Sequence, residues 1–282
     1  MSRSRSRSRP VATLAEVAAV GVAAARAGAG DVPLSPLHAD GHVGADWPDR
    51  RDVRGERVAG EMASLSAYAR PDFDPDTVDP AVRALYERTA DFGLTLTATW
   101  HRPFRLGARL ASRVTSRVEQ LNLAGPGGSP KRVSSDLFEL AEPAATADPR
   151  EAPRLWVRTD DDTGEAVFVA VYASHTVGDE RLVNVAVPLP GASLATVLRM
   201  TDRGDGLELT TDCPDGGLYL HTDAGAFELP ACQRFHVSPS DGPAAPDPPT
   251  GVDPAAADVL AAQRIRLLGL PLVTIRYAAT EE

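Results

Sequence analysis

The spacing of arginines is the feature of this sequence that most directly suggests binding chemistry. Arg105, Arg109, Arg113 and Arg117 recur every fourth residue, which aligns their guanidinium groups along one side of a helix. Like charges at this spacing destabilise a helix by roughly 0.2–0.5 kcal/mol per pair, so something should compensate this arginine stripe. Two interpretations stay open. The acidic remainder of the chain and solvent balance the stripe, or it binds an anionic ligand, lipid headgroup or partner.

Glu87, Arg88 and His175 complete the candidate site residues. A carboxylate, a guanidinium and an imidazole could perform acid–base chemistry if the fold brought them together with Arg117. Ser174 cannot serve as a nucleophile for His175, because neighbours on a strand point to opposite faces. The sequence contains no nucleophile elbow, zinc-protease, calcium-loop or kinase motif. The catalytic residues, if any, stay unknown, and we favour a protein that is not an enzyme.

Three potential metal ligands lie close together at His38, Asp40 and His42. Metal ligands are normally held in place by surrounding groups, and a loop that contains glycine offers little such support. We therefore expect solvated histidines, no metal and no cofactor. Cys213 and Cys232 are the only cysteines, and their spacing resembles neither a disulfide framework nor a zinc site. We expect reduced thiols, with a disulfide as the alternative.

The charge and hydropathy of the whole chain limit its partners. The 282 residues carry a formal net charge of −10, which argues against nucleic acid as a partner because phosphate binding needs a basic face. An apolar run of about 18 uncharged residues, long enough to cross a membrane, is absent. The sequence therefore predicts a cytoplasmic protein that binds a small apolar or anionic ligand, with contact to a membrane surface as an alternative.

The sequence divides into a leader and one folded domain. Residues 1–63 contain a Ser-Arg repeat and a stretch rich in Asp, Gly, Pro and Arg, which is typical of largely disordered leaders and linkers. Residues 11–29 are rich in Ala and predict a helix, although they also have the outline of a secretory signal. Residues 64–282 should form a single domain, with a mobile loop rich in Pro, Gly and Asp near residues 238–256.

Two amphipathic helices are predicted ahead of most strands. Asp79 is a favoured N-cap and Pro80 suits the first helical position, so a helix should run from there to a C-cap at Gly93. Pro103 should begin a second helix, which carries the arginine stripe. Between the two, residues 94–100 alternate apolar residues with threonines, which predicts a half-buried strand.

From Lys131 onward the pattern predicts short strands separated by turns. Gly, Asp and Pro bound candidate strands at intervals of about 8–12 residues, which indicates an antiparallel meander. The run VFVAVYA at residues 167–173 is apolar on both faces, so the sheet should be covered on both sides or closed on itself. The predicted fold class is α+β, with two N-terminal helices packed on a large antiparallel, curved or barrel-like β-meander sheet.

Short motifs spread over residues 65–280 carry one family resemblance. They include DFDP at 72–75, VRALYERT at 82–89, QLNL at 120–123, WVR at 156–158, YASHT at 172–176, NVAVPLP at 184–190, GLYL at 217–220 and GLPLVTIRY at 269–277. Together these motifs resemble the YndJ-like family of uncharacterised bacterial and archaeal proteins. Because the motifs are mostly apolar, the resemblance implies a shared fold, and it brings no established activity. Some relatives carry membrane-spanning helices before this domain.

Three functions follow as hypotheses. The first is a binding module, in which the sheet and helices enclose an apolar cavity and the arginine stripe meets the acidic group of a lipid-like ligand. The second is an enzyme that uses Glu87, Arg88, Arg117 and His175. The third is a structural or partner-binding domain with a filled core. A polar concave site that gathers these four residues would favour the enzyme, and an open apolar interior would favour the binding module.

Overall fold

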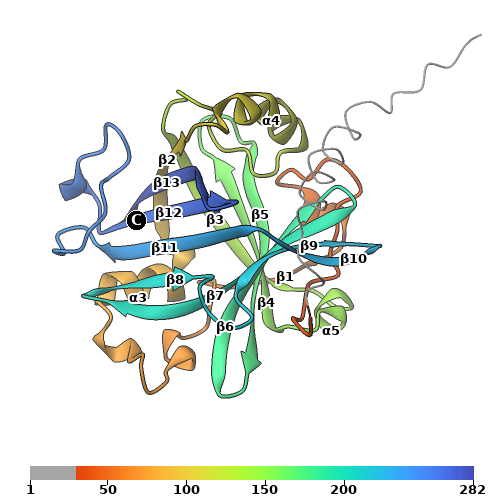
Figure 1. Cartoon of the computed structure of the whole chain (residues 1–282), viewed down its shortest axis with the longest axis horizontal. Helices are drawn as coiled ribbons and strands as arrows, with labels where there is room; N and C mark the ends of the chain where they lie inside the picture. The colour runs from red at the N-terminus through yellow and green to blue at the C-terminus, as the bar shows by residue number, and fades with distance from the viewer. Residues whose placement is uncertain (1–29) are drawn as a thin grey trace, which may run out of the picture.

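The computed structural model describes residues 30–282, which form mainly antiparallel β-strands (Figure 1). The strands are β1 (Arg54–Arg57), β2 (Phe92–Trp100), β3 (Lys131–Leu140), β4 (Glu151–Asp160), β5 (Ala166–Val177), β6 (Glu180–Leu189), β7 (Ala192–Arg203), β8 (Gly206–Thr210), β9 (Gly217–Thr222), β10 (Gly225–Leu229), β11 (Ala231–Pro239), β12 (Val259–Leu267) and β13 (Leu270–Glu281). The α-helices in this part of the chain are α2 (Trp47–Arg50), α3 (Pro80–Glu87), α4 (Arg105–Val118) and α5 (Ala144–Ala147). The 3-10 helices are η1 (Leu65–Tyr68), η2 (Pro75–Thr77), η3 (Thr89–Asp91) and η4 (Pro254–Ala256). The helix predicted at residues 11–29 lies outside the described residues.

Ten of the described strands form a closed barrel. Their order around the ring is β7-β6-β5-β4-β3-β2-β13-β12-β11-β8, and β8 pairs with β7 to complete it. β9 pairs with the first half of β7, β10 pairs with β9, and β1 pairs with β3. Closure of the ring pairs the strand edges that an open sheet would leave exposed. The prediction of an antiparallel, barrel-like sheet is confirmed.

β2 runs from one end of the barrel to the other and fixes the positions of α3 and α4. α3 and η3 precede its first residue, Phe92, and α4 follows its last residue, Trp100, so the two helices lie at opposite ends of the barrel (Figure 1). β13 pairs along the full length of β2, with Glu281 opposite Phe92 and Val273 opposite Trp100. We refer below to the α3 end and the α4 end of the barrel.

α3 buries one face at its end of the barrel. Asp79 caps the helix through its carboxylate, as predicted, and Tyr86 faces the core. The helix ends at Glu87 and does not reach the predicted C-cap at Gly93, which is the second residue of β2. The hydroxyl of Thr89 donates a hydrogen bond to a carbonyl of the last helical turn, and the chain then turns through η3 into the strand.

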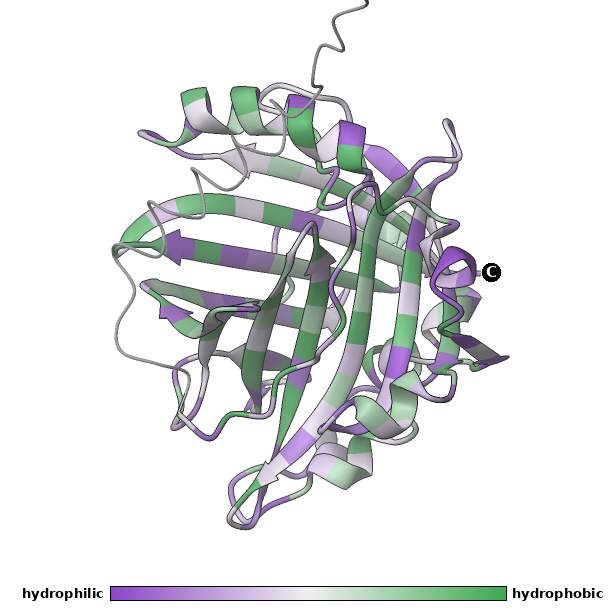
Figure 2. Cartoon of the chain, turned by 90° about the vertical axis from the view of Figure 1, so that its right-hand side faces the viewer, coloured by the Kyte–Doolittle hydropathy of each residue, from purple (hydrophilic) through white to green (hydrophobic). Residues whose placement is uncertain are grey.

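α4 forms where the second helix was predicted, but it packs loosely against the barrel. Ala108 is its only buried residue, and Ser112, Val114, Thr115 and Val118 are half-buried. Leu106 and Leu110 are 72% and 65% exposed, and Figure 2 shows hydrophobic and hydrophilic residues side by side on this helix at the top of the molecule. The α+β class is therefore corrected to a mostly β fold with few helices.

Residues 30–58 lie on the outer wall of the barrel, where the sequence predicted an irregular linker. Val43 and Trp47 are buried against outward-facing side chains of β4 and β5, which include Leu155 and Val169. These strands expose apolar side chains on the outside as well as the inside, so the few apolar residues of the segment have a surface to cover. This covering explains why the run in β5 is apolar on both faces.

The segment predicted as a mobile loop, residues 238–256, begins with the last two residues of β11 and includes η4. Val252 packs against Leu260 of β12, and the hydroxyl of Ser240 donates a hydrogen bond to the carbonyl of Ala257. These contacts attach the segment to the outside of the barrel. Its mobility stays a prediction.

Candidate functional site

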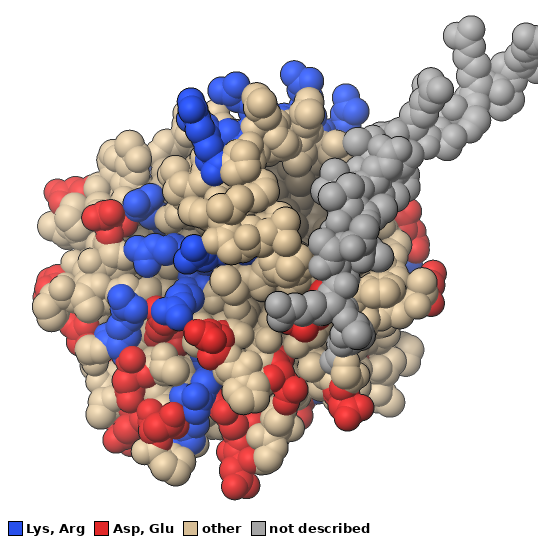
Figure 3. All heavy atoms as spheres, in the orientation of Figure 1, with Lys and Arg blue, Asp and Glu red and all other residues tan. Residues whose placement is uncertain are grey.

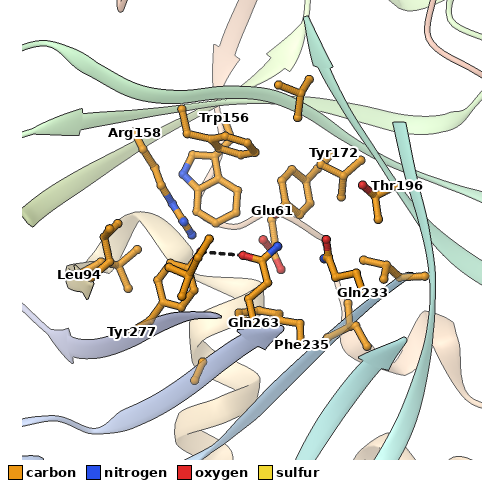
Figure 4. A pocket seen from close by; sticks show the side chains of 18 of the residues that line it. Glu61, Leu94, Trp156, Arg158, Tyr172, Thr196, Gln233, Phe235, Gln263 and Tyr277 are labelled. Atoms are coloured by element: carbon orange, nitrogen blue, oxygen red, sulfur yellow. Dashed lines mark hydrogen bonds between the residues drawn. The ribbon is translucent and has the colours of Figure 1, made fainter. Parts of the chain in front are cut away.

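An internal cavity of about 180 Å³ lies within the barrel (Figure 4). Its walls are mostly apolar side chains from strands around the ring. Leu85 and Tyr86 of α3 contribute from one end, and Leu121 and Leu123, which follow α4, also line it. For comparison, a cavity of about 150 Å³ lined by Leu, Ile and Phe accommodates benzene. The barrel interior is therefore large enough to hold a small molecule.

A group of polar side chains interrupts the apolar lining of this cavity. Its members are Glu61, Tyr86, Thr89, Trp156, Arg158, Tyr172, Thr196, Gln233, Gln263 and Tyr277. Figure 4 shows Glu61, Gln233 and Gln263 near one another, with Arg158 and Tyr277 to their left and Tyr172 above Glu61. A mostly apolar cavity with a few convergent polar groups is the usual form of a small-molecule site.

Glu61 lies between β1 and η1 and is almost completely buried, with 8% of its surface exposed. Its backbone amide donates a hydrogen bond of 3.2 Å to the hydroxyl of Thr89, which holds this segment at the α3 end. Burial raises the pKa of the Glu61 carboxyl to about 8, and attraction to the Arg158 guanidinium only partly offsets this effect. The carboxyl is consequently mostly protonated at neutral pH.

Arg158 and Trp156 are two residues apart on β4, so their side chains point to the same face of the strand, which is the cavity face. The side chains of Leu155 and Val157 point to the opposite face and pack on the outer wall. The guanidinium carbon of Arg158 lies 3.9 Å from the centre of a Trp156 ring and 5.6 Å from that of Tyr277. Its buried Nε has no hydrogen-bond partner, and no carboxylate of residues 30–282 forms an ion pair with it. Arg158 is thus a cation that contacts aromatic rings and the hydroxyl of Tyr277, without an anionic partner among these residues.

The other polar groups of the cavity are neutral. The hydroxyl of Tyr277 donates a hydrogen bond of 2.8 Å to Oε1 of Gln263. The buried hydroxyl of Tyr86 and the indole nitrogen of Trp156 have no hydrogen-bond partner among the described residues. Burial raises the pKa of Tyr86, Tyr172 and Tyr277 above the ordinary value, so these phenols stay protonated. Arg158 therefore supplies the cavity's net charge at neutral pH.

A smaller pocket of about 70 Å³ adjoins the cavity at the α3 end. Glu61, Tyr172 and Val183 line both spaces. The smaller pocket also includes Ala63 and Glu151, which are exposed at the surface. Glu61 thus lies between the surface and the interior of the barrel.

The arginine stripe does not reach the cavity. Arg105, Arg109, Arg113 and Arg117 are all exposed, and none of them lines the cavity. Figure 3 shows basic side chains gathered at the top of the molecule, where α4 lies, and most acidic side chains lower down. An anionic partner for the stripe stays a prediction, and such a partner would bind at the surface.

Glu87 and Arg88 lie at the α3 end, across the barrel from the stripe. Glu87 accepts a hydrogen bond of 2.7 Å from the amide of Leu65 and pairs with Arg83 at 3.3 Å. Arg88 pairs with Glu281 at 2.6 Å. These contacts attach η1 and the last residues of β13 to α3.

His175 lies apart from these residues, on the outer side of β5 beneath the segment that precedes β1. Its Nδ1 is 3.2 Å from the side-chain nitrogen of Asn184, which also donates a hydrogen bond to the carbonyl of Pro33. Burial lowers the pKa of His175 below the ordinary value for histidine. The structure therefore does not bring His175 together with Glu87, Arg88 or Arg117.

The other candidate ligands are also separate. His38 packs edge-on against His221, with ring centroids 5.2 Å apart, and Cys213 and Cys232 are free thiols. Within residues 30–282, no three His, Cys, Asp or Glu side chains are grouped so that they could hold a metal ion.

The cavity residues that sequence reasoning missed are Glu61, Arg158, Gln233 and Gln263. Glu61 fell in the predicted linker, so nothing indicated its burial. Arg158 could have been found from the sequence, because it lies on the same face of its strand as Trp156, while the opposite face is apolar. A strand that is apolar on one face and carries Trp and Arg on the other could have been assigned to a barrel with a partly polar interior.

Fold and cavity together define, within residues 30–282, a closed antiparallel β-barrel with a mostly apolar cavity that contains the cation of Arg158. The chain is 25% identical over 235 residues to a protein of Bacillus subtilis (strain 168) named uncharacterized membrane protein YndJ. The match covers 79% of this chain and 38% of that protein, so the chain spans less than half the length of its relative. The YndJ-like resemblance is confirmed as a distant relationship. No protein-family model matches the chain, and no solved structure is significantly similar to it.

The predicted cytoplasmic location is corrected by this comparison, because the relative is named as a membrane protein. The expectation rested on the lack of a long apolar run, which does not by itself determine a location. Among the helices of residues 30–282, none has the length and apolar character needed to cross a membrane.

Proposed function

We propose that this chain is a binding module that takes up a small apolar ligand inside the barrel. The observation that carries the proposal is the cavity of about 180 Å³ lined mainly by apolar side chains. Protein interiors are normally close-packed, and a large cavity is destabilising because its lining loses van der Waals contacts. A ligand that fills the cavity would restore those contacts and would be held by burial of its apolar surface.

The same observation weighs against a purely structural domain, whose interior would be filled. The enzyme hypothesis requires Glu87, Arg88, Arg117 and His175 in one site, and they lie at three separate places around the barrel. Among the described residues that line the cavity, no pair within hydrogen-bond reach could act as nucleophile and base. Ligand binding therefore accounts for more of the observed geometry than catalysis does.

A second candidate role is contact with an anionic membrane surface through α4. Leu106 and Leu110 are one helical turn apart and largely exposed, beside the four exposed arginines. Apolar side chains of a surface helix can enter the headgroup region, while arginines attract anionic lipids. The name of the Bacillus relative supports this role.

1-Octanol is a suitable probe of the cavity because it is apolar, uncharged and small. Isothermal titration calorimetry should detect saturable binding, and the melting temperature of the protein should rise with the concentration of 1-octanol. Organic extraction of the purified protein, followed by mass spectrometry, would identify any natural ligand that copurifies.

A pair of alanine variants locates the binding. Ala261 lies on β12 and lines the cavity, so Ala261→Leu should occupy part of it and weaken 1-octanol binding about tenfold. Ala256→Leu, at an exposed position in η4, is the matched control and should leave binding unchanged. The proposal fails if 1-octanol does not bind, or if both variants bind it as the native chain does.

A further inference from the structure

We propose that Arg158 binds the acidic head of the ligand, so that the cavity selects a small monocarboxylate with an apolar tail. This inference rests on the proposed function, because it assigns the ligand's chemistry within the same cavity. It differs from the sequence hypothesis, in which the arginine stripe of α4 met the acidic group. The stripe is exposed, whereas Arg158 faces the apolar interior.

The first support is the lack of a counterion for Arg158. A buried charge is costly unless it is paired and hydrogen-bonded, and Arg154 of the same strand donates a hydrogen bond of 2.6 Å to the carbonyl of Gly60. Arg158 has no such acceptor at its buried Nε and no ion-pair partner among residues 30–282. A ligand that carries a carboxylate would supply both.

The second support is that Glu61 does not neutralise Arg158. The two side chains line the same cavity, but their charged atoms are not within ion-pair distance. Burial raises the pKa of Glu61 to about 8, so its carboxyl is mainly uncharged at neutral pH. The other titratable groups near Glu61 are the phenols of Tyr68, Tyr86 and Tyr172, whose pKa values are raised by burial and by Glu61, so they are neutral. The positive charge of Arg158 therefore remains available to a ligand.

The third support is the geometry around the guanidinium. Stacking on Trp156 at 3.9 Å orients the planar fork of Arg158, and a planar fork matches the two oxygens of a carboxylate. Tyr277 uses Oε1 of Gln263 as its acceptor, which leaves the amide nitrogen of Gln263 available as a further donor. Figure 4 shows Arg158 and Tyr277 close together, with Gln263 beside Tyr277 and near Glu61.

The remaining walls specify the rest of the ligand. Away from this polar side the cavity is lined by aliphatic side chains such as Val185, Leu198 and Leu209, which favour a hydrocarbon or aromatic tail. The volume of about 180 Å³ excludes a long acyl chain. Octanoate has this combination of one carboxylate and a short apolar tail.

The test compares three probes of equal chain length by isothermal titration calorimetry at neutral pH. The native chain should bind octanoate about tenfold or more tightly than 1-octanol, as a charge-assisted hydrogen-bond pair would require. Octylamine should bind more weakly than 1-octanol, because its ammonium group would be repelled by Arg158.

Variants of Arg158 assign the preference to this side chain. Arg158→Met keeps an unbranched side chain without charge, so it should abolish the preference for octanoate and retain 1-octanol binding. Arg158→Lys keeps the charge without the fork and should retain only part of the preference. Arg132→Met is the matched control, since Arg132 on the adjacent strand is 70% exposed, and it should change neither affinity.

The outcomes separate this inference from the proposed function. If 1-octanol binds and octanoate binds no better, the inference is overturned while the binding module stands. The inference also fails if Arg158→Met keeps the octanoate preference of the native chain. If neither probe binds, the proposed function itself fails, and the inference with it. Should Arg158→Met not fold, the ratio of the two affinities in the native chain and in Arg158→Lys decides the result.

Discussion

Arg150 and Arg158 lie on opposite sides of the barrel wall and differ in nearly every contact they make. Arg150, on the outer side, donates two hydrogen bonds of 2.8 Å to the carboxylate of Asp148, and both side chains are 0% exposed. It also donates to the carbonyl of Asn184 at 2.9 Å. Arg158, on the inner side, contacts the rings of Trp156 and Tyr277 and has no ion-pair partner among the described residues.

This difference separates a structural charge from one that is available for binding. The hydroxyl of Ser35 adds a further hydrogen bond of 2.9 Å to Asp148, so the Arg150 pair also ties the outer segment to the barrel. Burial alone would raise the pKa of Asp148, but the hydrogen bonds and charge of Arg150 hold it below the ordinary value. Arg150 has a complete set of partners within the chain, whereas Arg158 lacks one. The comparison predicts that disrupting the first pair harms the fold and altering the second residue harms binding.

The largest expected effect is on the outer pair. Asp148→Ala would leave the guanidinium of Arg150 buried without its counterion, which should lower the free energy of unfolding by about 3–5 kcal/mol. Urea unfolding followed by circular dichroism would measure the change. Asp162→Ala is the matched control, because Asp162 is 71% exposed and its ion pair with Arg132, at 3.6 Å, lies at the surface. This substitution should change the free energy of unfolding by less than about 0.5 kcal/mol. Equal effects of the two substitutions would contradict the structural role of Arg150.

A pH-dependent effect is expected on the inner side, where Glu61 is buried without a salt bridge. The carboxyl has an ordinary pKa of 4.5, which applies to the unfolded chain, and a pKa of about 8 in the fold. Between these pH values the folded state binds the extra proton, so the free energy of unfolding should decrease as pH rises through this window. Glu61→Gln cannot ionise, so it should remove this decrease and be about 2–4 kcal/mol more stable than the native chain near pH 8.5.

Unfolding measurements at several pH values test this expectation for Glu61. The native chain and Glu61→Gln should have similar stability near pH 5, where the native carboxyl is protonated in the fold. Asp162→Asn, at the exposed position already used as a control, should leave the pH profile of the native chain unchanged. A native profile that stays flat between pH 5 and pH 8 would mean that Glu61 is not desolvated, and the contrast between the two sides of the wall would be weaker.

Much of the barrel could be predicted from the sequence, because strand periodicity is a local signal. Alternation over residues 94–100 predicted β2, and the double-faced run at residues 167–173 predicted a sheet that is closed or covered. β1 and the exact limits of α3 were missed. β1 has only four residues and depends on pairing with β3, and α3 stops where the Thr89 hydroxyl binds the backbone. Both depend on contacts that no local pattern encodes.

The site was harder to predict than the fold. The arginine stripe was predicted as a candidate binding site because its spacing is regular. Regular spacing on a helix, however, shows only that the charges lie on the same face. Arg158 is a single residue, and its importance comes from the lack of a partner inside a closed barrel. Glu61 reaches the same cavity from a segment that looked like a linker. Such convergence depends on the ring of nonlocal pairings, above all β2 with β13 and β8 with β11.

The smallest expected effect concerns the arginines of α4, which lack ion-pair partners among the described residues, as Arg158 does, but are exposed to water. Arg109→Ala combined with Arg113→Ala removes a like-charged pair, so the free energy of unfolding should rise by roughly 0.2–0.5 kcal/mol. Because the stripe does not line the cavity, binding of 1-octanol and octanoate should not change. A fall in stability of more than about 1 kcal/mol would mean that these arginines make structural contacts.

The same double variant tests the proposed contact with a membrane surface. Cosedimentation with vesicles that contain phosphatidylserine should decrease in the variant, and the decrease should shrink at high salt because ions screen exposed charges. Vesicles of phosphatidylcholine alone are the control and should bind neither chain strongly. Leu106→Ser should also reduce cosedimentation, because this leucine is 72% exposed and has an apolar side chain to insert. If neither substitution changes vesicle binding, the stripe is a solvated face. Of the unpaired arginines compared, only Arg158 inside the barrel would then contribute to binding.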